Sequence, residues 1–394
     1  MITFDFHHYS LNSEEQKKKE EIKKRFLEED NMKGWYDLER QEKNLTEIET
    51  TAQEIKKNCD IFLVIGIGGS FLGAKALYEA MRNPYRKETP EIIFTGTTIP
   101  RDSLEELKDY LKEKEIILNV ISKSGNTLET ILTLKELLPL LKEKYQEKWN
   151  ERIIITTNQQ KGQLYEFSNQ YQIKRFTIEE DIGGRFSVLS TVGLLPLEVA
   201  GLDIKALLEG AKQAKKDEEK AYTYAFLRHK FYQEGKSLEA FTIYDEKLSY
   251  FTEWLKQLLA ESEGKEGKGL FPISLVYSRD LHSLGQYLQE GPSLCFETHI
   301  RAIQKNKDFN FLEEKLEESI CNSHLENNIP NIRITMDEKN EWNMGYLIFF
   351  FYLSTMMGSY LLEVPYYNQN GVEIYKKKLT QSLKENPDLE IHLI

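Results

Sequence analysis

The sequence predicts an α/β protein with two doubly wound parallel-sheet domains that pack together. Short, continuous apolar runs such as Ile61–Ile65 alternate with amphipathic helical segments, as expected of parallel strands that helices cover on both faces. The alternation stops near residue 181 and resumes near residue 237, with no low-complexity linker between the halves. We therefore expect two similar α/β domains in contact rather than two domains on a flexible tether.

The first half of the chain opens with a helical arm and continues with four strand-like runs. Residues 13–57 are charged, contain no proline and have a helical pattern. Strands are predicted at 61–65, 92–95, 116–121 and 152–156, and helices at 70–81, 104–111 and 128–141. Strand–helix alternation of this kind indicates parallel strands joined by helical crossovers.

The second half repeats the alternation after a helical stretch that ends near residue 233. Strands are predicted at 237–243, 273–277, 294–300 and 332–336, and helices at 248–259, 281–288 and 372–383. These patterns predict four regions along the chain. They are a helical N-terminal arm (1–50), a first sheet domain (51–215), a second sheet domain (216–345) and C-terminal helices (346–394).

The composition favours a cytoplasmic protein without a nucleic-acid partner. The 394 residues include 52 Lys and Arg against 64 Asp and Glu, a net charge of −12, which repels nucleic acid and anionic lipid. Cys59, Cys295 and Cys321 lie far apart and form no CxxC pair, which fits a reducing compartment. The first fifteen residues contain no apolar segment typical of a secretory signal.

One uncharged stretch, residues 344–362, is long enough, at about 20 residues, to cross a bilayer. Its immediate flanks are acidic, at Glu341 and Glu363, and it contains several small or polar residues. Membrane spans favour basic residues at their cytoplasmic ends. We therefore predict a buried core helix and no membrane contact, with a membrane span as the alternative.

Two loops that leave predicted strands are suited to bind a phosphate. The first, Gly66-Ile-Gly-Gly-Ser70, places Ser70 near the start of a helix, where glycine lets the backbone approach an anion and free N–H groups favour it. Neither common nucleotide motif fits, because Phe71 replaces a fingerprint glycine and Ala74 replaces the P-loop lysine. A tight glycine turn without a ligand is the alternative.

The second loop, Ser122-Lys-Ser-Gly-Asn-Thr127, also joins a buried strand to a helix. Three hydroxyls and one ammonium within six positions form a donor-rich nest for a phosphate. We expect Asn126, with Glu129, to cap the helix. An ordinary Ser/Thr turn is the alternative. We expect the strands before these two loops to be neighbours. A single phosphate held by the two loops together then explains why each loop is suited to an anion.

Four further side chains are candidates for catalysis, and each has an ordinary alternative. Arg185 follows Gly183-Gly184, where it can stabilise developing negative charge, although a surface arginine after a turn has the same pattern. Glu261 ends a predicted helix and is a candidate base, or part of a solvated turn. His282, at a predicted helix start, is the third candidate, although a lone histidine there is ordinarily a packing residue. Lys376, on the last predicted helix, is the fourth, although an isolated lysine there is ordinarily solvated.

Taken in order, seven segments closely resemble the phosphoglucose isomerase (glucose-6-phosphate isomerase) family in its compact bacterial form. The segments run in family order over nearly the whole chain, so chance matches do not explain them. They are VIGIGGSFLGAKA from Val64, VISKSGNTLET from Val120, GGRFSVLSTVGLLPLEVAG from Gly183, ESEGKEGKGLFP from Glu261, RDLHSLGQYLQEG from Arg279, NIPNI from Asn328 and NQNGVEIYKKKL from Asn368.

The resemblance implies two sugar-isomerase (SIS) domains, a cytoplasmic homodimer, and interconversion of glucose 6-phosphate and fructose 6-phosphate in glycolysis and gluconeogenesis. It implies that Glu261 is the general base that acts through a cis-enediol, and that His282, from the partner subunit, assists ring opening. Arg185 would steady the enediolate and Lys376 would help with ring oxygen and hydroxyl handling. The implied substrate-binding residues are Gly69, Ser70, Ser122, Lys123, Ser124, Thr127, Gln257 and Gln369.

The implied reaction moves a proton between neighbouring carbons without a redox change. No nicotinamide, other cofactor or metal is therefore expected, which agrees with the failed nucleotide motifs and with the lack of a metal-ligand spacing among the seven histidines. Two alternatives stay open. One is an isomerase for another phosphosugar, such as mannose 6-phosphate, and the other is a non-catalytic regulator that binds a sugar phosphate.

Overall fold

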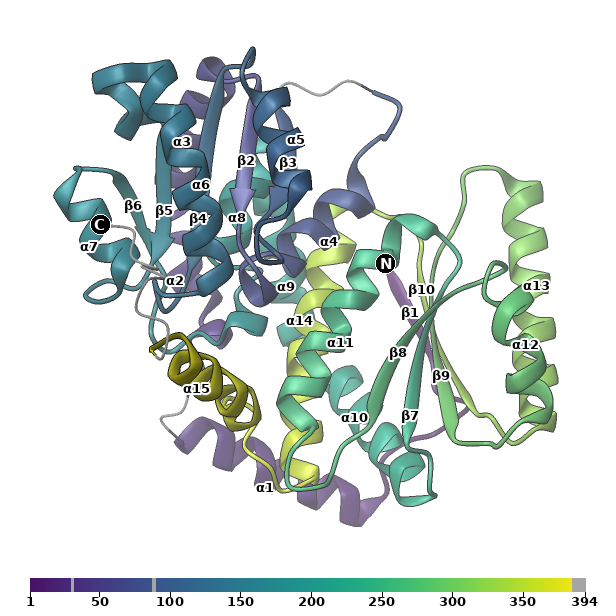
Figure 1. Ribbon diagram of the computed structural model, residues 1–394. Helices are drawn as coiled ribbons and strands as arrows, with labels where there is room; N and C mark the ends of the chain where they lie inside the picture. Colours follow the sequence, from purple (N-terminus) through teal and green to yellow (C-terminus); the bar gives the residue numbers. More distant parts are fainter. Residues whose placement is uncertain (30–31, 87–89, 385–394) are drawn as a thin grey trace. The chain divides into compact units, whose positions relative to one another are not determined.

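A computed structural model describes residues 1–29, 32–86 and 90–384 of the chain (Figure 1). The chain divides into two compact units, each with a five-stranded sheet. The first unit comprises Met32–Tyr78, Arg82–Ile204 and Asn370–Ile394, and the second comprises Met1–Asn31, Glu79–Met81 and Lys205–Gln369. The predicted region boundaries at residues 50, 215 and 345 stay a prediction, and residues 385–394 of the last region lie outside the described residues.

The first unit contains a fully parallel sheet in the order β3-β2-β4-β5-β6. The strands are β2 (Ile61–Ile65), β3 (Glu91–Thr95), β4 (Ile116–Ser122), β5 (Ile153–Thr157) and β6 (Lys174–Thr177). Every residue of β2, β4 and β5 is buried, which explains their continuous apolar runs. β2 pairs with β4, so the loops that follow these two strands are neighbours, as predicted.

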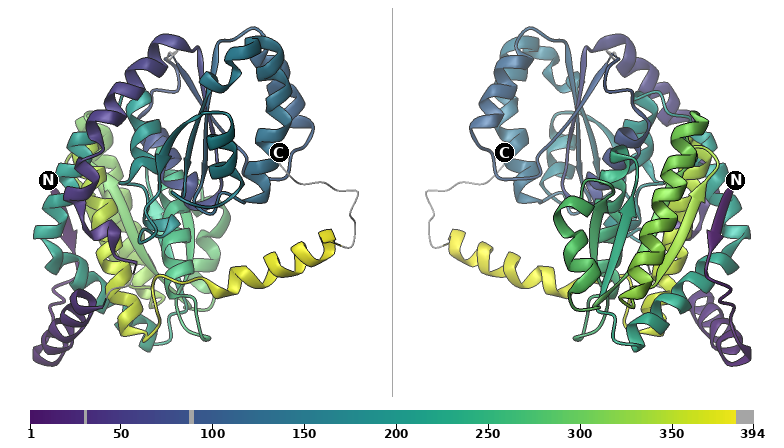
Figure 2. Two further views of the ribbon diagram at one scale, coloured as in Figure 1. Left: turned by 90° about the vertical axis from the view of Figure 1, so that its left-hand side faces the viewer. Right: turned by 90° about the vertical axis from the view of Figure 1, so that its right-hand side faces the viewer.

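Helices cover both faces of the first sheet (Figure 2). Alternate strand residues such as Leu63, Leu118 and Ile155 belong to one hydrophobic cluster with the helices α5, α6 and α7, because side chains along a strand alternate between faces. The helices of this unit are α2 (Leu38–Glu42), α3 (Leu45–Asn58), α4 (Leu72–Met81), α5 (Asp102–Leu111), α6 (Leu128–Tyr145), α7 (Gln163–Gln170), α8 (Thr191–Val199) and α15 (Asn370–Lys384).

The second unit contains a sheet in the order β1-β10-β9-β7-β8. The strands are β1 (Ile2–Asp5), β7 (Leu238–Ile243), β8 (Phe271–Val276), β9 (Cys295–Ala302) and β10 (Asn331–Met336). Four strands are parallel, whereas β1 pairs antiparallel with β10. The sequence analysis does not predict β1 or β6, and both are four-residue strands at the edge of a sheet.

Two groups of helices cover the faces of the second sheet (Figure 1). α10, α11 and α14 pack together on one face, and α12 and α13 pack together on the other. The helices of this unit are α1 (Ser13–Glu28), α9 (Ile204–Lys216), α10 (Glu218–Gln233), α11 (Ser249–Glu263), α12 (Leu281–Glu290), α13 (Lys307–Glu326) and α14 (Glu341–Leu361).

The long apolar stretch forms α14, which is a core helix. It is the one helix among the described residues that is long and apolar enough to cross a membrane, and 94% of its most apolar stretch is buried inside the protein. Both faces of α14 therefore contact protein, which explains why its sequence lacks a polar stripe. The predicted core helix is confirmed.

Candidate active site

The hydroxyl-rich loop after β4 is held together by its own side chains. The Ser122 Oγ lies 2.7 Å from the Thr127 Oγ1, and the Ser124 Oγ accepts a hydrogen bond from the Asn126 N–H at 3.2 Å. α6 begins directly after Thr127, so its free N–H groups lie at the end of this loop. The loop therefore joins several hydroxyls to a helix N-terminus, as an anion site requires.

The predicted cap at the start of α6 is wrong, whereas Ser70 lies near the start of α4, as predicted. The Asn126 side chain does not cap α6, because its Oδ1 accepts a hydrogen bond from the Gln163 N–H at 3.0 Å. Thr127 occupies the cap position without a capping bond, since its hydroxyl pairs with Ser122. Ser70 ends a short 3-10 turn over Gly68–Ser70, and α4 starts later, at Leu72.

The loop that carries Arg185 joins the two phosphate-suited loops. The Lys123 Nζ donates hydrogen bonds to the main-chain carbonyls of Glu180 and Ile182, at 2.9 and 2.7 Å, and burial lowers the pKa of Lys123. Gly69 lies directly against Gly184 in the same loop. The structure thus gathers three loops, 66–70, 122–127 and 180–187, within the first unit.

Seven predicted site residues lie in these three loops, and they differ in burial. The Arg185 side chain is 2% exposed, so its guanidinium is largely withdrawn from water and interacts more strongly with an anion than a surface arginine would. The Ser187 Oγ links the loops further, with hydrogen bonds to the carbonyls of Gly184 at 2.6 Å and Gly69 at 3.3 Å. The seven residues are Gly69, Ser70, Ser122, Lys123, Ser124, Thr127 and Arg185.

Gln257 and Glu261 lie in the last turns of α11, in the second unit. The Gln257 Nε2 donates a hydrogen bond to the Glu261 Oε1 at 3.2 Å. Both side chains are half-buried, whereas Leu258 and Leu259 between them face the core. The helix ends at Glu263, as the sequence predicts to within four residues, and its residues place the amide and the carboxylate one turn apart on the same side.

His282 lies at the opposite edge of the second sheet from Glu261. α11 connects the carboxyl end of β7 to the amino end of the parallel strand β8. The last turn of α11, with Glu261, therefore lies at the edge where the strands begin. His282 follows the carboxyl end of β8, at the start of α12, and its side chain is exposed. The six residues of β8 separate these edges by about 20 Å, at about 3.3 Å a residue.

The last two predicted residues lie near the C-terminus of the described chain. Gln369 directly precedes α15, and Lys376 lies on α15. The Lys376 Nζ forms an ion pair with the Glu373 Oε1 at 2.8 Å, one turn earlier on the same helix.

A buried charged network, which the sequence analysis does not anticipate, connects α10, α11 and β7. The Arg228 Nε donates to the Glu239 Oε2 at 2.7 Å, and its two terminal nitrogens donate to the Glu263 carboxylate at 2.8 and 3.0 Å. All three side chains are at most 2% exposed. Arg228 stands in an aromatic helical stretch of the sequence, which is the only signal that it faces the interior.

A second buried network lies between β9 and α13. The Glu297 Oε2 contacts the His324 Nδ1 at 2.9 Å and the His299 Nε2 at 3.3 Å. Burial would raise the pKa of Glu297, but the two imidazoles lower it to about 2. Burial would likewise lower the pKa of His299, but the contacts with Cys321 and Glu297 raise it to about 10. Both groups are therefore charged at neutral pH.

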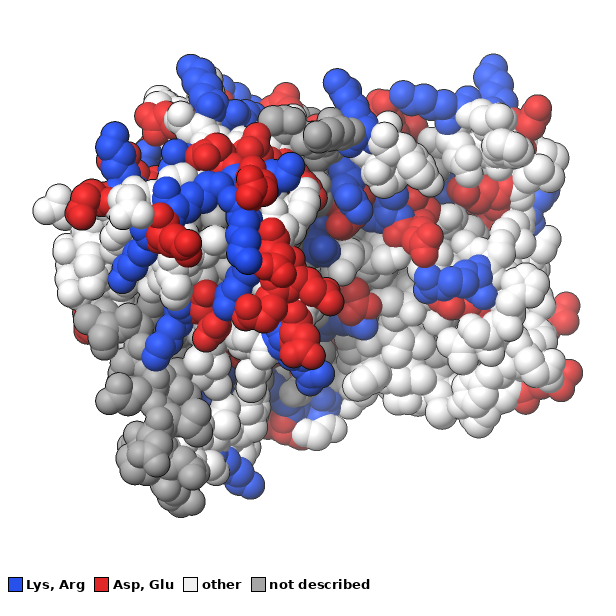
Figure 3. Space-filling model, turned by 45° about the horizontal axis from the view of Figure 1, so that its top comes forward, with Lys and Arg blue, Asp and Glu red and all other residues white. Residues whose placement is uncertain are grey.

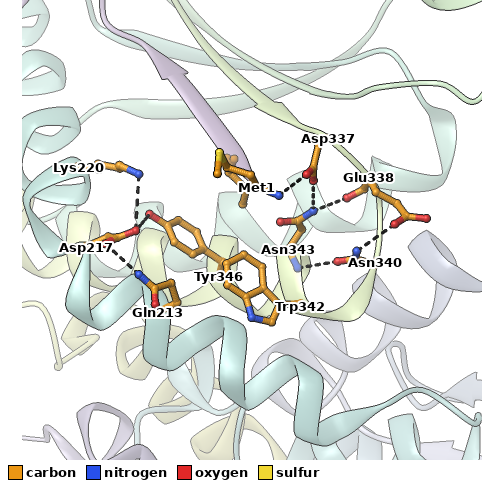
Figure 4. Close-up of a pocket in the computed structure, with 11 residues that line it drawn as sticks. Met1, Gln213, Asp217, Lys220, Asp337, Glu338, Asn340, Trp342, Asn343 and Tyr346 are labelled. Atoms are coloured by element: carbon orange, nitrogen blue, oxygen red, sulfur yellow. Dashed lines mark hydrogen bonds and ion pairs between the residues drawn. The ribbon is translucent and has the colours of Figure 1, made fainter. Parts of the chain in front are cut away.

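A pocket of about 540 Å³ opens beside α14 in the second unit (Figure 4). Trp342 and Tyr346 form its aromatic wall with ring centroids 5.8 Å apart, and Asp217 accepts a hydrogen bond from the Tyr346 hydroxyl at 3.2 Å. It contains none of the predicted site residues. In the described part of the chain, no group of three or more His, Cys, Asp or Glu side chains is arranged to hold a metal ion.

Comparisons with known proteins agree on one family. A profile described as phosphoglucose isomerase matches residues 37–269, more than half of the chain. The glucose-6-phosphate isomerase of Streptococcus thermophilus is 39% identical over 385 residues, covering 88% of this chain and 85% of that protein. The glucose-6-phosphate isomerase of Mycoplasmopsis synoviae (strain 53) is 40% identical and covers 91% of each chain. A solved hypothetical protein of Thermus thermophilus has a TM-score of 0.86 at 28% identity, over 94% of this chain and 96% of that one.

Proposed function

This chain belongs to the phosphoglucose isomerase family, and we propose that it interconverts glucose 6-phosphate and fructose 6-phosphate through a cis-enediol intermediate. The observation that carries this function is the meeting of three anion-suited loops, 66–70, 122–127 and 180–187, in the first unit. They offer hydroxyls and backbone N–H groups to one phosphate, and they carry two cations, Lys123 and Arg185. The alternation of sheet and helix places all three at the carboxyl ends of strands, where such folds bind ligands.

The phosphate end of the substrate supplies binding energy far from the reacting carbons. Ser122, Ser124 and Thr127 hold the phosphate with the free N–H groups of α6, while Lys123 keeps the loop of Arg185 attached. Because the phosphate does not change during the reaction, its contacts serve to orient the sugar. No step needs an oxidant or a reductant.

The proton transfer is assigned to Glu261. Its carboxylate removes the proton from carbon 2 of the open aldose and returns it to carbon 1 of the enediol, on the same face of the substrate. Such a base contributes about 10²–10⁴-fold to the rate. Arg185 stabilises the oxygen that gains negative charge in the enediolate, and Gln257 orients Glu261 through its hydrogen bond of 3.2 Å.

His282 and Lys376 are assigned to opening the sugar ring, in which a proton leaves the carbon 1 hydroxyl and another reaches the ring oxygen. The imidazole of His282 is exposed, so it can reach a substrate. Lys376 and Gln369 contact the sugar hydroxyls. We expect the reaction in the cytoplasm and in the presence of a chelator.

A homodimer with a shared active site is supported by the positions of Glu261 and His282. A separation of about 20 Å along β8 exceeds the reach of two side chains to one small sugar. A second copy is needed to bring an imidazole to each carboxylate. The α12–α13 side is suited to this contact, because both helices expose large apolar side chains. On α12 these are Leu284 and Tyr287, and on α13 they are Phe309, Phe311 and Leu312.

The distribution of charged side chains on the surface also supports a contact between two copies at α12 and α13. Lys, Arg, Asp and Glu side chains are mixed over the left-hand part of the view, whereas uncharged side chains predominate in its lower right-hand part, on the side of α12 and α13 (Figure 3). Monomeric proteins seldom expose several large apolar side chains in one area. A twofold contact buries such an area on both copies at once.

The test of the reaction is the variant Glu261→Gln. We expect it to lose deuterium exchange at carbon 2 in heavy water and to lose turnover in a coupled assay with fructose 6-phosphate. It should still bind the substrate, because Glu261 is not among the residues proposed to hold the phosphate. A variant that folds and turns over at the wild-type rate would show that Glu261 is not the base.

The shared site has its own test, a mixture of two inactive variants. Glu261→Gln and His282→Asn are unfolded together and refolded together, so that mixed dimers form. Each mixed dimer regains one intact site of two, and half of the dimers are mixed, so about a quarter of the wild-type activity is expected. If the mixture stays inactive while each variant alone is dimeric and folded, each site is built from one chain.

A further inference from the structure

We infer that Arg228 and Glu263 are positioning residues for the proton-transferring carboxylate, because they fix the last turn of α11 on which Glu261 lies. The inference rests on the proposed function, in which Glu261 is the base. Arg228 touches no substrate in this account and acts only through the helix. Its three donated hydrogen bonds join α10 to α11 and β7.

The contact between Arg228 and Glu263 is bidentate, so it fixes both the position and the orientation of the Glu263 carboxylate. Two parallel N–H···O bonds, 2.8 and 3.0 Å long, hold the carboxylate in the plane of the guanidinium, and this fork restricts both position and angle. Glu239 accepts a hydrogen bond from the third Arg228 nitrogen, Nε, at 2.7 Å, and also accepts from Tyr224 and Thr298 at 2.5 and 2.9 Å. All three guanidinium nitrogens therefore bind a carboxylate.

Burial makes this contact costly to break and leaves it few alternative arrangements. Glu263 is 1% exposed and Arg228 is 2% exposed, so neither charge has water as a substitute partner. Burial alone would lower the pKa of Arg228, but the two carboxylates raise it well above its ordinary value. Glu263 thus has one position in which its carboxylate pairs with Arg228. Holding the side chain in this position also restricts the helix backbone beside it.

The restraint reaches Glu261 through less than one turn of helix. Two residues advance a helix by about 200°, so Glu261 and Glu263 point to opposite sides of α11. Glu263 faces α10 and α14, whereas Glu261 is half-buried on the other side. A shift of the Glu263 anchor therefore moves the Glu261 carboxylate without removing any group that contacts the substrate.

α14 completes the anchor with a glycine that leaves room for Glu263. A Cβ at Gly358 would lie 2.5 Å from the Glu263 Oε1 and 3.2 Å from the Arg228 Nη1. The next residue, Ser359, donates to the Ser262 carbonyl at 3.4 Å, and the Lys265 Nζ donates to the same carbonyl at 2.7 Å. The last turn of α11 is thus held by side chains from both neighbouring helices and from its own loop.

The experiment compares Glu263→Gln with a matched variant, Glu317→Gln. Glu317 also forms a buried pair, with its Oε2 3.0 Å from the Arg301 Nε, but it lies on α13 and not on α11. Both variants lose one buried carboxylate charge, so both are expected to lower thermal stability. Turnover is measured per folded molecule, below the melting range, with glucose 6-phosphate carrying hydrogen or deuterium at carbon 2.

We expect Glu263→Gln to lower kcat by about 10- to 100-fold, since a displacement near 1 Å in a reacting group costs about that much. KM should stay within about twofold of the wild-type value, because the phosphate contacts are untouched. The isotope effect on kcat should be at least as large as in the wild type, because proton removal is the slowed step. Glu317→Gln should keep the wild-type kcat and isotope effect.

Equal kcat in Glu263→Gln and Glu317→Gln would overturn the positioning role. If Glu263→Gln does not fold, Gly358→Ala decides, because it keeps every charge and adds one methyl group against Glu263. It should show the same loss of kcat, and a wild-type kcat in Gly358→Ala would also overturn the inference. The variant Glu261→Gln separates the two claims, since normal turnover in that variant refutes the proposed function whatever Glu263→Gln does.

Discussion

Replacing Gly69 with alanine is expected to separate two of the loops that we propose to bind the phosphate. A Cβ at this position would lie 2.2 Å from both the carbonyl carbon and the oxygen of Gly184. Non-bonded carbon atoms ordinarily approach to about 3.5 Å, so the loops must part by about 1 Å. The obstacle is backbone and not a side chain, so no change of rotamer relieves it.

The separation has a calculable effect on activity. A displacement of about 1 Å in a positioning element costs about 10²-fold, which corresponds to about 2.7 kcal/mol of transition-state stabilisation. We expect this loss in kcat/KM for fructose 6-phosphate, measured by coupling the product to a glucose-6-phosphate dehydrogenase. The loss should lie mainly in KM, because in the proposed function the loops hold the unreacting phosphate.

A neighbouring glycine provides the control for this substitution. A Cβ at Gly183 would meet only the Phe186 Cδ2 at 3.6 Å, an ordinary contact, and its φ of −67° suits alanine. Gly183→Ala should therefore keep nearly all of its activity. If Gly69→Ala and Gly183→Ala have the same kcat/KM, the close approach of the two loops does not matter for substrate binding, and the reasoning is refuted.

Three further predictions follow from the described contacts. Lys123→Met removes two hydrogen bonds from an ammonium to main-chain carbonyls, one of them part-buried, which should cost about 1–3 kcal/mol in denaturant unfolding and raise KM; unchanged unfolding would contradict this. The pKa of His299 is raised to about 10 in the folded protein, whereas an unfolded histidine has a pKa of about 6.5. Protonated His299 should therefore stabilise the fold fully below about pH 6.5, and this stabilisation should be lost as the pH rises to about 10. A His299→Gln variant should lack that alkaline decline in melting temperature, and an identical decline would contradict the assignment. Tyr287→Glu places a charge on the exposed apolar side of α12 and should abolish dimers in light scattering together with activity; an active dimer would exclude this face.

The sequence predicts most clearly the strands that are buried along their whole length. All five residues of β2 are buried, and an uninterrupted apolar run of this length is typical of a strand that helices cover on both faces. β6 has the sequence Lys-Arg-Phe-Thr at an edge of its sheet, where one side needs no apolar partner. β1 forms by pairing Ile2 with Met336 and its neighbours in turn, and no local pattern encodes a partner so distant in the sequence.

The candidate site was predictable to the level of loops but not of hydrogen bonds. Glycine and hydroxyl residues after buried strands predict which loops are suited to an anion, because few other positions favour both, and the structure brings these loops together. The partner that each hydroxyl or amide selects depends on tertiary contacts, as when Asn126 binds the Gln163 N–H instead of capping α6. Arg228 and Glu263 lie 35 residues apart, and charged residues on helices are usually solvated, so their buried pair has no sequence signature.

The position of Glu261 and His282 at opposite edges of one sheet has a consequence for the enzyme at low abundance. A lone chain would carry two half-sites and no whole one, so its specific activity should fall on dilution as subunits part. Excess substrate would slow that decline, since in the proposed shared site each sugar would bridge two chains and oppose their separation. The amount of the protein in a cell would then set not only how many sites exist but also what fraction of them is complete.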